Sequence, residues 1–171
     1  MHQENARDHG ADGNHWPHGY RPDRYDISFA AVWRVPLPAD AAYATLADVA
    51  AYPSWWTPFR AVRTVGPGAC DVVIRSVLPY ALRARLTAVV EDPAERVLEA
   101  ALDGDVSGSV RWVVLPDGSG ACAARFAQHV TVRKAALRRW MPFARPFFHL
   151  NHGLAMRAGR RGLAARARRG R

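Results

Sequence analysis

The chain has 171 residues, with 24 Lys or Arg and 15 Asp or Glu, which gives a formal net charge of +9. Hydrophobic residues make up 49% of the sequence, but no run of them approaches the ~20 consecutive apolar residues of a membrane-spanning helix. Length and composition therefore favour one globular domain with a substantial core and exclude a helical membrane protein.

The beginning of the chain is polar and shows no apolar periodicity. We expect residues 1–24 to be a disordered leader, because such a segment buries nothing that would offset the entropy cost of ordering it. The leader lacks the apolar core of a secretory signal, which makes the cytoplasm the expected location. Its histidines are irregularly spaced and predict no metal site: His2, His9, His15 and His18.

A strand, two short helices and an aromatic turn are predicted next. Residues 27–35 alternate with one uniformly apolar side, which is typical of a half-buried strand. Pro38 precedes a predicted helix over residues 39–47, since proline suits the first position of a helix. Residues 48–59 predict a shorter helix and then an aromatic turn broken by prolines, in which Tyr52, Trp55 and Trp56 are the side chains of interest.

From residue 70 to residue 132 the sequence predicts a series of strands joined by short turns. Alternate residues are apolar and the opposite set carries the charges, so one face is buried and the other faces water. On the presumed inward face the polar residues are Ser76 and Gln128, and Arg96 is a further candidate in the strand over residues 95–102. The result is a curved sheet around an apolar interior, which is either a plain core or a pocket for an apolar ligand.

The two cysteines, Cys70 and Cys122, fall on different predicted strands and both point inward. We interpret them as buried free thiols in a reducing compartment. The sequence contains no glycine-rich phosphate loop, Ser-His-Asp arrangement or metal-ligand cluster. We therefore expect no cofactor and no metal.

After residue 132 the pattern changes to a long helix, with an expected kink near Pro142 and Pro146. At about 100° per residue, Phe147 and the apolar residues near it form one arc, with Asn151 near its middle and His152 at its edge. A buried amide needs a hydrogen-bond partner. Asn151 is thus either a satisfied core residue or an anchor for a polar group of a ligand.

The charge of the chain is concentrated at its C-terminal end. Residues 118–171 contain 13 Lys or Arg and no acidic residue. Seven of these 13 lie in the last fifteen residues, and this basic segment either contacts an anionic membrane surface or is a solvated helix end. It contains no aromatic residue on which bases could stack, so we expect no nucleic-acid partner.

In its order of elements, and in four segments, the chain resembles the START-like, or SRPBCC, superfamily, and its polyketide cyclase/dehydratase-like branch in particular. The resemblance covers residues 25–166 and implies one ligand-binding domain there, followed by a basic tail over residues 167–171. The four segments are VPLPADAAYATLADVAAYPSWWTPF (residues 35–59), GPGACDVVIRSVLPYALRARLTAVVEDP (66–93), DGSGACAARFAQHVTV (117–132) and FFHLNHGLAMRAGRRGL (147–163).

The resemblance implies an α+β helix-grip fold. A curved antiparallel sheet of about seven strands would wrap around the long C-terminal helix, with two short helices after the first strand. The ligand cavity would lie between the sheet and the helix. Its predicted lining is Tyr52, Trp55, Trp56, Ser76, Trp112, Phe126, Gln128, Phe148, Asn151 and Ala155, with the tryptophan pair and Tyr52 framing the mouth.

Three functions are compatible with this fold, which hosts many activities. The first is binding of a hydrophobic, aromatic polyketide-like or lipid-like molecule without chemistry, by a monomer or homodimer. The second is a polyketide cyclase or dehydratase that acts mainly by orienting its substrate, with His152 as the best candidate general base. The third is contact with a membrane or a partner through the basic tail.

Overall fold

The computed structural model describes residues 25–75 and 81–169. Its sheet has seven antiparallel strands in the order β1-β7-β6-β5-β4-β3-β2. The elements are β1 (Asp26–Val35), α1 (Ala39–Ala47), the 3-10 helix η1 (Val49–Ser54), β2 (Phe59–Gly66), β3 (Ala69–Ile74), β4 (Leu82–Asp92), β5 (Val97–Gly104), β6 (Val106–Pro116), β7 (Cys122–Val132) and α2 (Ala135–Arg169).

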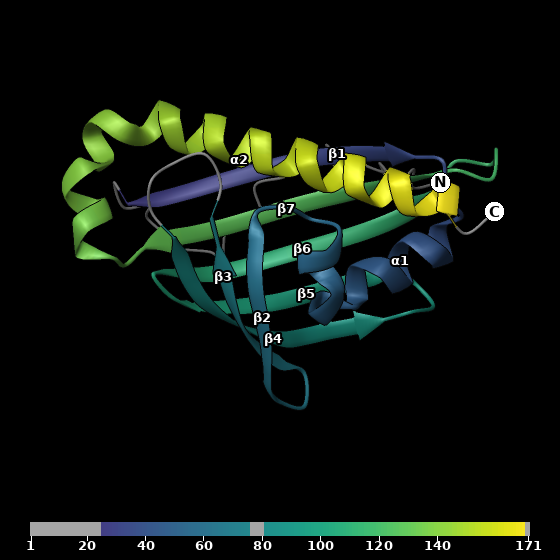
Figure 1. The fold of residues 1–171 in the computed structure, drawn as a ribbon, viewed down its shortest axis with the longest axis horizontal. Helices are drawn as coiled ribbons and strands as arrows, with labels where there is room; N and C mark the ends of the chain where they lie inside the picture. Colours follow the sequence, from purple (N-terminus) through teal and green to yellow (C-terminus); the bar gives the residue numbers. More distant parts are fainter. Residues whose placement is uncertain (1–24, 76–80, 170–171) are drawn as a thin grey trace, which may run out of the picture.

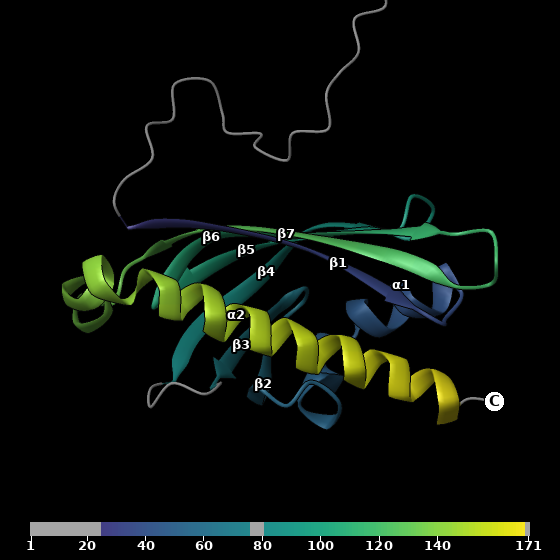
Figure 2. The same cartoon turned by 90° about the horizontal axis from the view of Figure 1, so that it is seen from above.

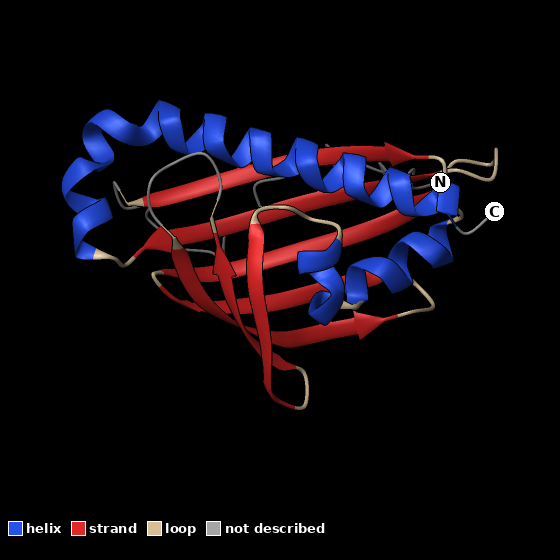
Figure 3. Ribbon diagram, viewed as in Figure 1, coloured by secondary structure: helices blue, strands red, loops and turns tan. Residues whose placement is uncertain are grey.

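This arrangement confirms the expected helix-grip fold. The helix α2 runs along one face of the sheet, and the β2–β3 end of the sheet curls round toward the same side (Figures 1 and 2). The helices α1, η1 and α2 all lie on this side (Figure 3). The first turns of α2 run in a different direction from the rest of the helix (Figure 1), as expected for a helix that contains two prolines near its start.

The predicted strand faces are confirmed. Ile27, Trp33 and Val35 of β1 are buried, as are Val114 and Ala124 on the same face of β6 and β7. This face of the sheet forms the core with α1, η1 and α2. The two-residue period of a strand therefore placed the inward side chains correctly from sequence.

The inward position considered for Arg96 is wrong. Arg96 lies in the turn before β5, where it has a positive φ of 55°. From there its guanidinium forms an ion pair with Asp40 of α1 on the outside of the domain. The strand begins one residue later, at Val97, so its alternation starts after the arginine.

The predicted buried face of α2 is confirmed at Phe148 and wrong at its reference residue, Phe147. Phe147 and Leu150 are each 58% exposed, whereas Phe148, Met156 and Leu163 are buried. The helix is therefore turned by roughly 100° from the predicted arc, and His152 lies within the face directed at the sheet. The side of α2 that faces the sheet includes Gly159 and Gly162, which lie directly against the opposing tryptophans.

Small residues of α2 allow these tryptophans to approach the helix backbone. A Cβ atom at Gly159 would overlap the indoles of Trp33 and Trp56. One at Gly162 would overlap the backbone oxygen of Trp55. The part of α2 around Gly159 and Gly162 is therefore packed tightly against the tryptophans. The space between α2 and the sheet that side chains leave open lies beside the preceding turns of the helix.

Among residues 25–75 and 81–169, no helix combines the length and the apolarity needed to cross a membrane.

Candidate functional site

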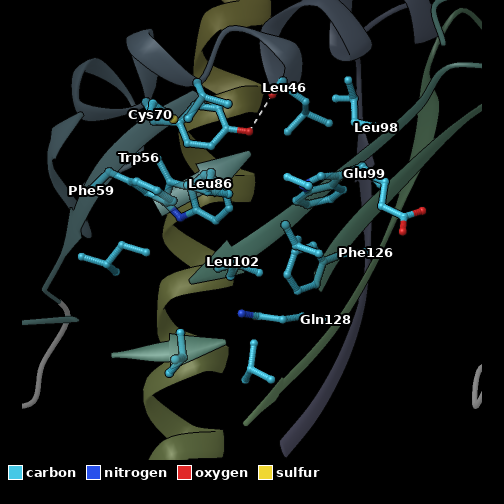
Figure 4. A pocket seen from close by; sticks show the side chains of 18 of the residues that line it. Leu46, Trp56, Phe59, Cys70, Leu86, Leu98, Glu99, Leu102, Phe126 and Gln128 are labelled. Atoms are coloured by element: carbon cyan, nitrogen blue, oxygen red, sulfur yellow. Dashed lines mark hydrogen bonds between the residues drawn. The ribbon is translucent and has the colours of Figure 1, made fainter. Parts of the chain in front are cut away.

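A cavity of about 400 Å³ lies between the inward face of the sheet, η1 and α2. It is only partly enclosed. Its walls are mainly apolar side chains from β2, β4, β5 and β7 (Figure 4), among them Phe59, Leu86, Leu98, Leu102 and Phe126. The alternative left open by the sequence, a core filled completely by side chains, does not describe this part of the interior.

Nine of the residues proposed for the site line this cavity. They come from η1 and the turn after it, from β6 and β7, and from one stretch of α2. Ser76 lies outside the described residues. The nine are Tyr52, Trp56, Trp112, Phe126, Gln128, Phe148, Asn151, His152 and Ala155.

Trp55 is absent from the cavity lining within the described residues, so its proposed place at the mouth is wrong. The residue is buried instead between η1 and α2, where its ring stacks on Trp56 at a centroid distance of 5.5 Å. Its indole nitrogen has no hydrogen-bond partner among the described residues. Consecutive residues at the end of a helical turn point in different directions, and only Trp56 of the pair reaches the cavity.

Tyr52 and Trp56 are also buried rather than at an open mouth. The Tyr52 hydroxyl donates a hydrogen bond of 2.6 Å to the Leu46 backbone oxygen (Figure 4). Burial raises the pKa of this hydroxyl well above its usual value. The Trp56 Nε1–H donates to the Ala155 backbone oxygen at 2.8 Å, which ties this wall of the cavity to α2.

An aromatic cluster forms part of the cavity wall. Trp112 contacts Trp33 and Phe126, each with a centroid distance of 4.7 Å. Tyr52 and Phe59 meet at 4.9 Å in an edge-to-face arrangement. Such contacts hold large side chains in fixed positions. The cavity therefore presents rigid ring surfaces to anything that occupies it.

His152 forms part of the wall between α2 and the sheet. Its ring stacks on Phe29 of β1 with a centroid distance of 3.8 Å and an interplanar angle of 11°, and Phe126 is 5.6 Å away. Burial, with a smaller contribution from His149, lowers the pKa of His152 to about 4. The imidazole is therefore neutral at pH 7 and a weak proton acceptor.

Phe29 was not among the proposed site residues, although it lines the cavity and contacts His152. Met156 also lines the cavity and was not among the proposed residues. Phe29 lay on the correct face of the first predicted strand, so the two-residue period was the signal that identified it as inward. Its pairing with a particular helix residue depends on the rotation of α2, which the sequence pattern placed wrongly.

Both thiols are free and Cys122 is buried, as expected, whereas Cys70 lines the cavity and is half-buried rather than buried. Burial raises the pKa of each thiol. A raised pKa keeps a thiol protonated at neutral pH and therefore poorly nucleophilic. Within residues 25–75 and 81–169, no group of three or more His, Cys, Asp or Glu side chains is placed to hold a metal ion.

The fold and the cavity define a helix-grip protein with an internal apolar site. The chain belongs to the family described as "Polyketide cyclase / dehydrase and lipid transport", whose model matches residues 26–168. No curated protein matches the sequence.

Several solved structures share the fold at low sequence identity. The Zhui aromatase/cyclase from Streptomyces sp. R1128 is 18% identical, with a TM-score of 0.68 over 84% of this chain and 94% of that one. A START superfamily protein from Mycobacterium smegmatis is 15% identical, with a TM-score of 0.66 over 85% and 99% of the two chains. The di-domain ARO/CYC BexL is 15% identical, with a TM-score of 0.65 over 84% of this chain and 50% of its own.

Proposed function

We propose that this protein binds a hydrophobic small molecule in the cavity between the sheet and α2. The observation that carries the proposal is the cavity itself, which has a volume of about 400 Å³, mainly apolar walls and a few polar groups. Sites for small molecules commonly have this size and composition. The family description, which joins polyketide cyclases with lipid transport, supports the same class of ligand.

A titration with 9-methylanthracene, a neutral apolar probe, tests the proposal. Trp56 and Trp112 line the cavity, so saturable one-to-one binding should quench tryptophan fluorescence. The variant Ala100→Phe places a ring in the cavity lining, whereas Ala101→Phe places the same ring on the exposed face of β5. We expect Ala100→Phe alone to weaken binding. Equal binding by the two variants would contradict the proposal.

Catalysis of a cyclisation is a second candidate, favoured by the similarity to the Zhui aromatase/cyclase. A histidine with a pKa of about 4 is a poor general base at neutral pH, so the chemistry would depend mainly on holding a reactive chain in a productive conformation. Unchanged turnover of a polyketide-like chain by His152→Ala would remove His152 from the reaction and leave orientation as the source of catalysis.

Contact with an anionic membrane surface is a third candidate, and the outer face of α2 favours it. Phe147 and Leu150 are exposed there, and Arg157 and Arg161 are exposed further along the same face. Apolar residues followed by cations on one helix face suit a negatively charged lipid surface.

Cosedimentation with vesicles of phosphatidylglycerol or phosphatidylcholine tests this membrane contact. Replacing both Phe147 and Leu150 with Ser should reduce binding to the anionic vesicles. A truncation at Arg166 should reduce binding mainly at low salt, where charge attraction is least screened. Unchanged binding by both proteins would exclude a membrane role for this face and for the basic tail.

A further inference from the structure

The amide of Gln128 is an unused polar group in an apolar cavity. Gln128 lies in the middle of β7, with Phe29 of β1 and Val110 of β6 as its partners in register. Its side chain extends into the cavity (Figure 4), where it has no hydrogen-bond partner within the described part of the chain. Because an amide offers both a donor and an acceptor, Gln128 is equipped to bind a polar group of an occupant.

The other polar side chains of the α2 wall lie close to Gln128. Phe29, its neighbour on β1, stacks on His152, and Phe126, two residues earlier on the same face of β7, also contacts His152. The preceding residue of α2, Asn151, lines the cavity too. Gln128, Asn151 and His152 therefore form one polar level in the cavity, and the neutral imidazole adds no positive charge to it.

The charged residues of the lining disfavour an anion. The described lining contains Asp48, Glu91 and Glu99 but neither Lys nor Arg. Glu99 pairs with Arg111, and its carboxylate points away from the neighbouring cavity side chains (Figure 4). Asp48 accepts a hydrogen bond from the Ala51 backbone nitrogen. A carboxylate or phosphate placed at the polar level would thus lose its hydration without gaining a counter-charge.

We propose that the cavity selects an uncharged ligand whose aromatic or alicyclic skeleton carries a hydroxyl or keto group, and that Gln128 recognises this group. The inference rests on the proposed function. It narrows the ligand class by excluding free fatty acids and other carboxylates of comparable size. Gln128 discriminates in this way because it can donate to a carbonyl and accept from a hydroxyl but cannot neutralise an anion.

Three anthracenes of nearly equal size provide the test: 9-anthracenemethanol, 9-methylanthracene and 9-anthracenecarboxylate. At pH 7 the wild-type protein should bind the alcohol at least about 30-fold more tightly than the carboxylate, since desolvation of an unpaired carboxylate is costly. Equal affinities for the alcohol and the carboxylate would overturn the inference.

Variants at position 128 test the residue itself. Gln128→Met keeps a similar length and removes the amide, so affinity for the alcohol should fall by about 3- to 10-fold, as expected for one hydrogen bond. Affinity for 9-methylanthracene should stay the same or rise, which shows that the variant is folded. Gln128→Asn keeps the amide on a side chain that is one methylene group shorter, so the amide lies further from the ligand. This variant should lose part of the affinity for the alcohol.

The outcomes separate this inference from the proposed function. If none of the three compounds binds the wild-type protein, the proposed function fails and the inference fails with it. If 9-methylanthracene binds but Gln128→Met and Gln128→Asn both leave the affinity for the alcohol unchanged, Gln128 does not recognise the polar group. The cavity then remains a hydrophobic binding site.

Discussion

At the scale of single residues, His152 shows how burial changes the chemistry available to a side chain. Its ring is packed against Phe29 and Phe126, and burial lowers its pKa to about 4. The sequence made this residue a candidate general base because it is titratable. Because it is buried against two aromatic rings, its imidazole is instead an uncharged part of the cavity wall. This burial depends on contacts between segments that are distant in the sequence.

The lowered pKa predicts a specific dependence of stability on pH. Between pH 6.5 and pH 4 the unfolded chain binds a proton at His152 and the folded protein does not, so folding becomes less favourable as pH falls. The loss attributable to His152 should reach about 3 kcal/mol. Denaturant unfolding at pH 7.5 and pH 4.5 measures it. His152→Phe, which keeps an aromatic ring, should lose distinctly less stability than the wild type, and equal losses would contradict this account.

At the scale of elements, the sheet was more predictable than the helix that crosses it. The side chains of a strand can point to only two faces of the sheet, and the charged residues of β4 and β6 identify the solvent-exposed face. A helix can bury any arc of its surface, and the apolar residues of α2 are spread around it. The buried arc is selected by contacts of Gly159 and Gly162 with tryptophans from β1 and the turn after η1. The sequence pattern does not contain these contacts, so it wrongly predicted Phe147 to be buried.

Among the site residues, the alternation of the strands correctly identified Trp112, Phe126 and Gln128 as inward. The positions of Trp55 and of the ring that stacks on His152 depend on tertiary packing, which the alternation does not describe.

Two glycines of α2 give a matched test of this packing. Gly159→Ala should destabilise the protein by about 1–3 kcal/mol, because its methyl group would overlap Trp33 and Trp56. Gly153 is exposed and has nothing within 4 Å of a Cβ atom, so Gly153→Ala should stabilise by up to about 1 kcal/mol through helix propensity. Urea unfolding of both variants gives the two values. If Gly159→Ala is no less stable than Gly153→Ala, α2 does not pack as described.

At the scale of the whole molecule, we propose that residues 25–166 form the ligand-binding unit and that residues 1–24 and 167–171 add little to its stability. Deleting residues 1–20 should leave the melting temperature within about 1 °C of the full-length value, because that segment has no apolar pattern to bury. Ending the chain at Ala144 should prevent folding, since it removes Phe148, Met156 and Leu163 from the core. Circular dichroism of both truncated proteins provides the comparison. A lower melting temperature in the first would assign the leader a structural role.

The domain contains a cavity between the sheet and α2, and we propose that an apolar molecule binds in it. A crystal structure of the protein grown with 9-methylanthracene measures this most directly. We expect the ligand to lie between the sheet and α2, in contact with Trp112, Phe126 and Ala155, with the backbone of α2 in the position described. A structure in which side chains fill this space, or in which the ligand binds only outside it, would contradict the account.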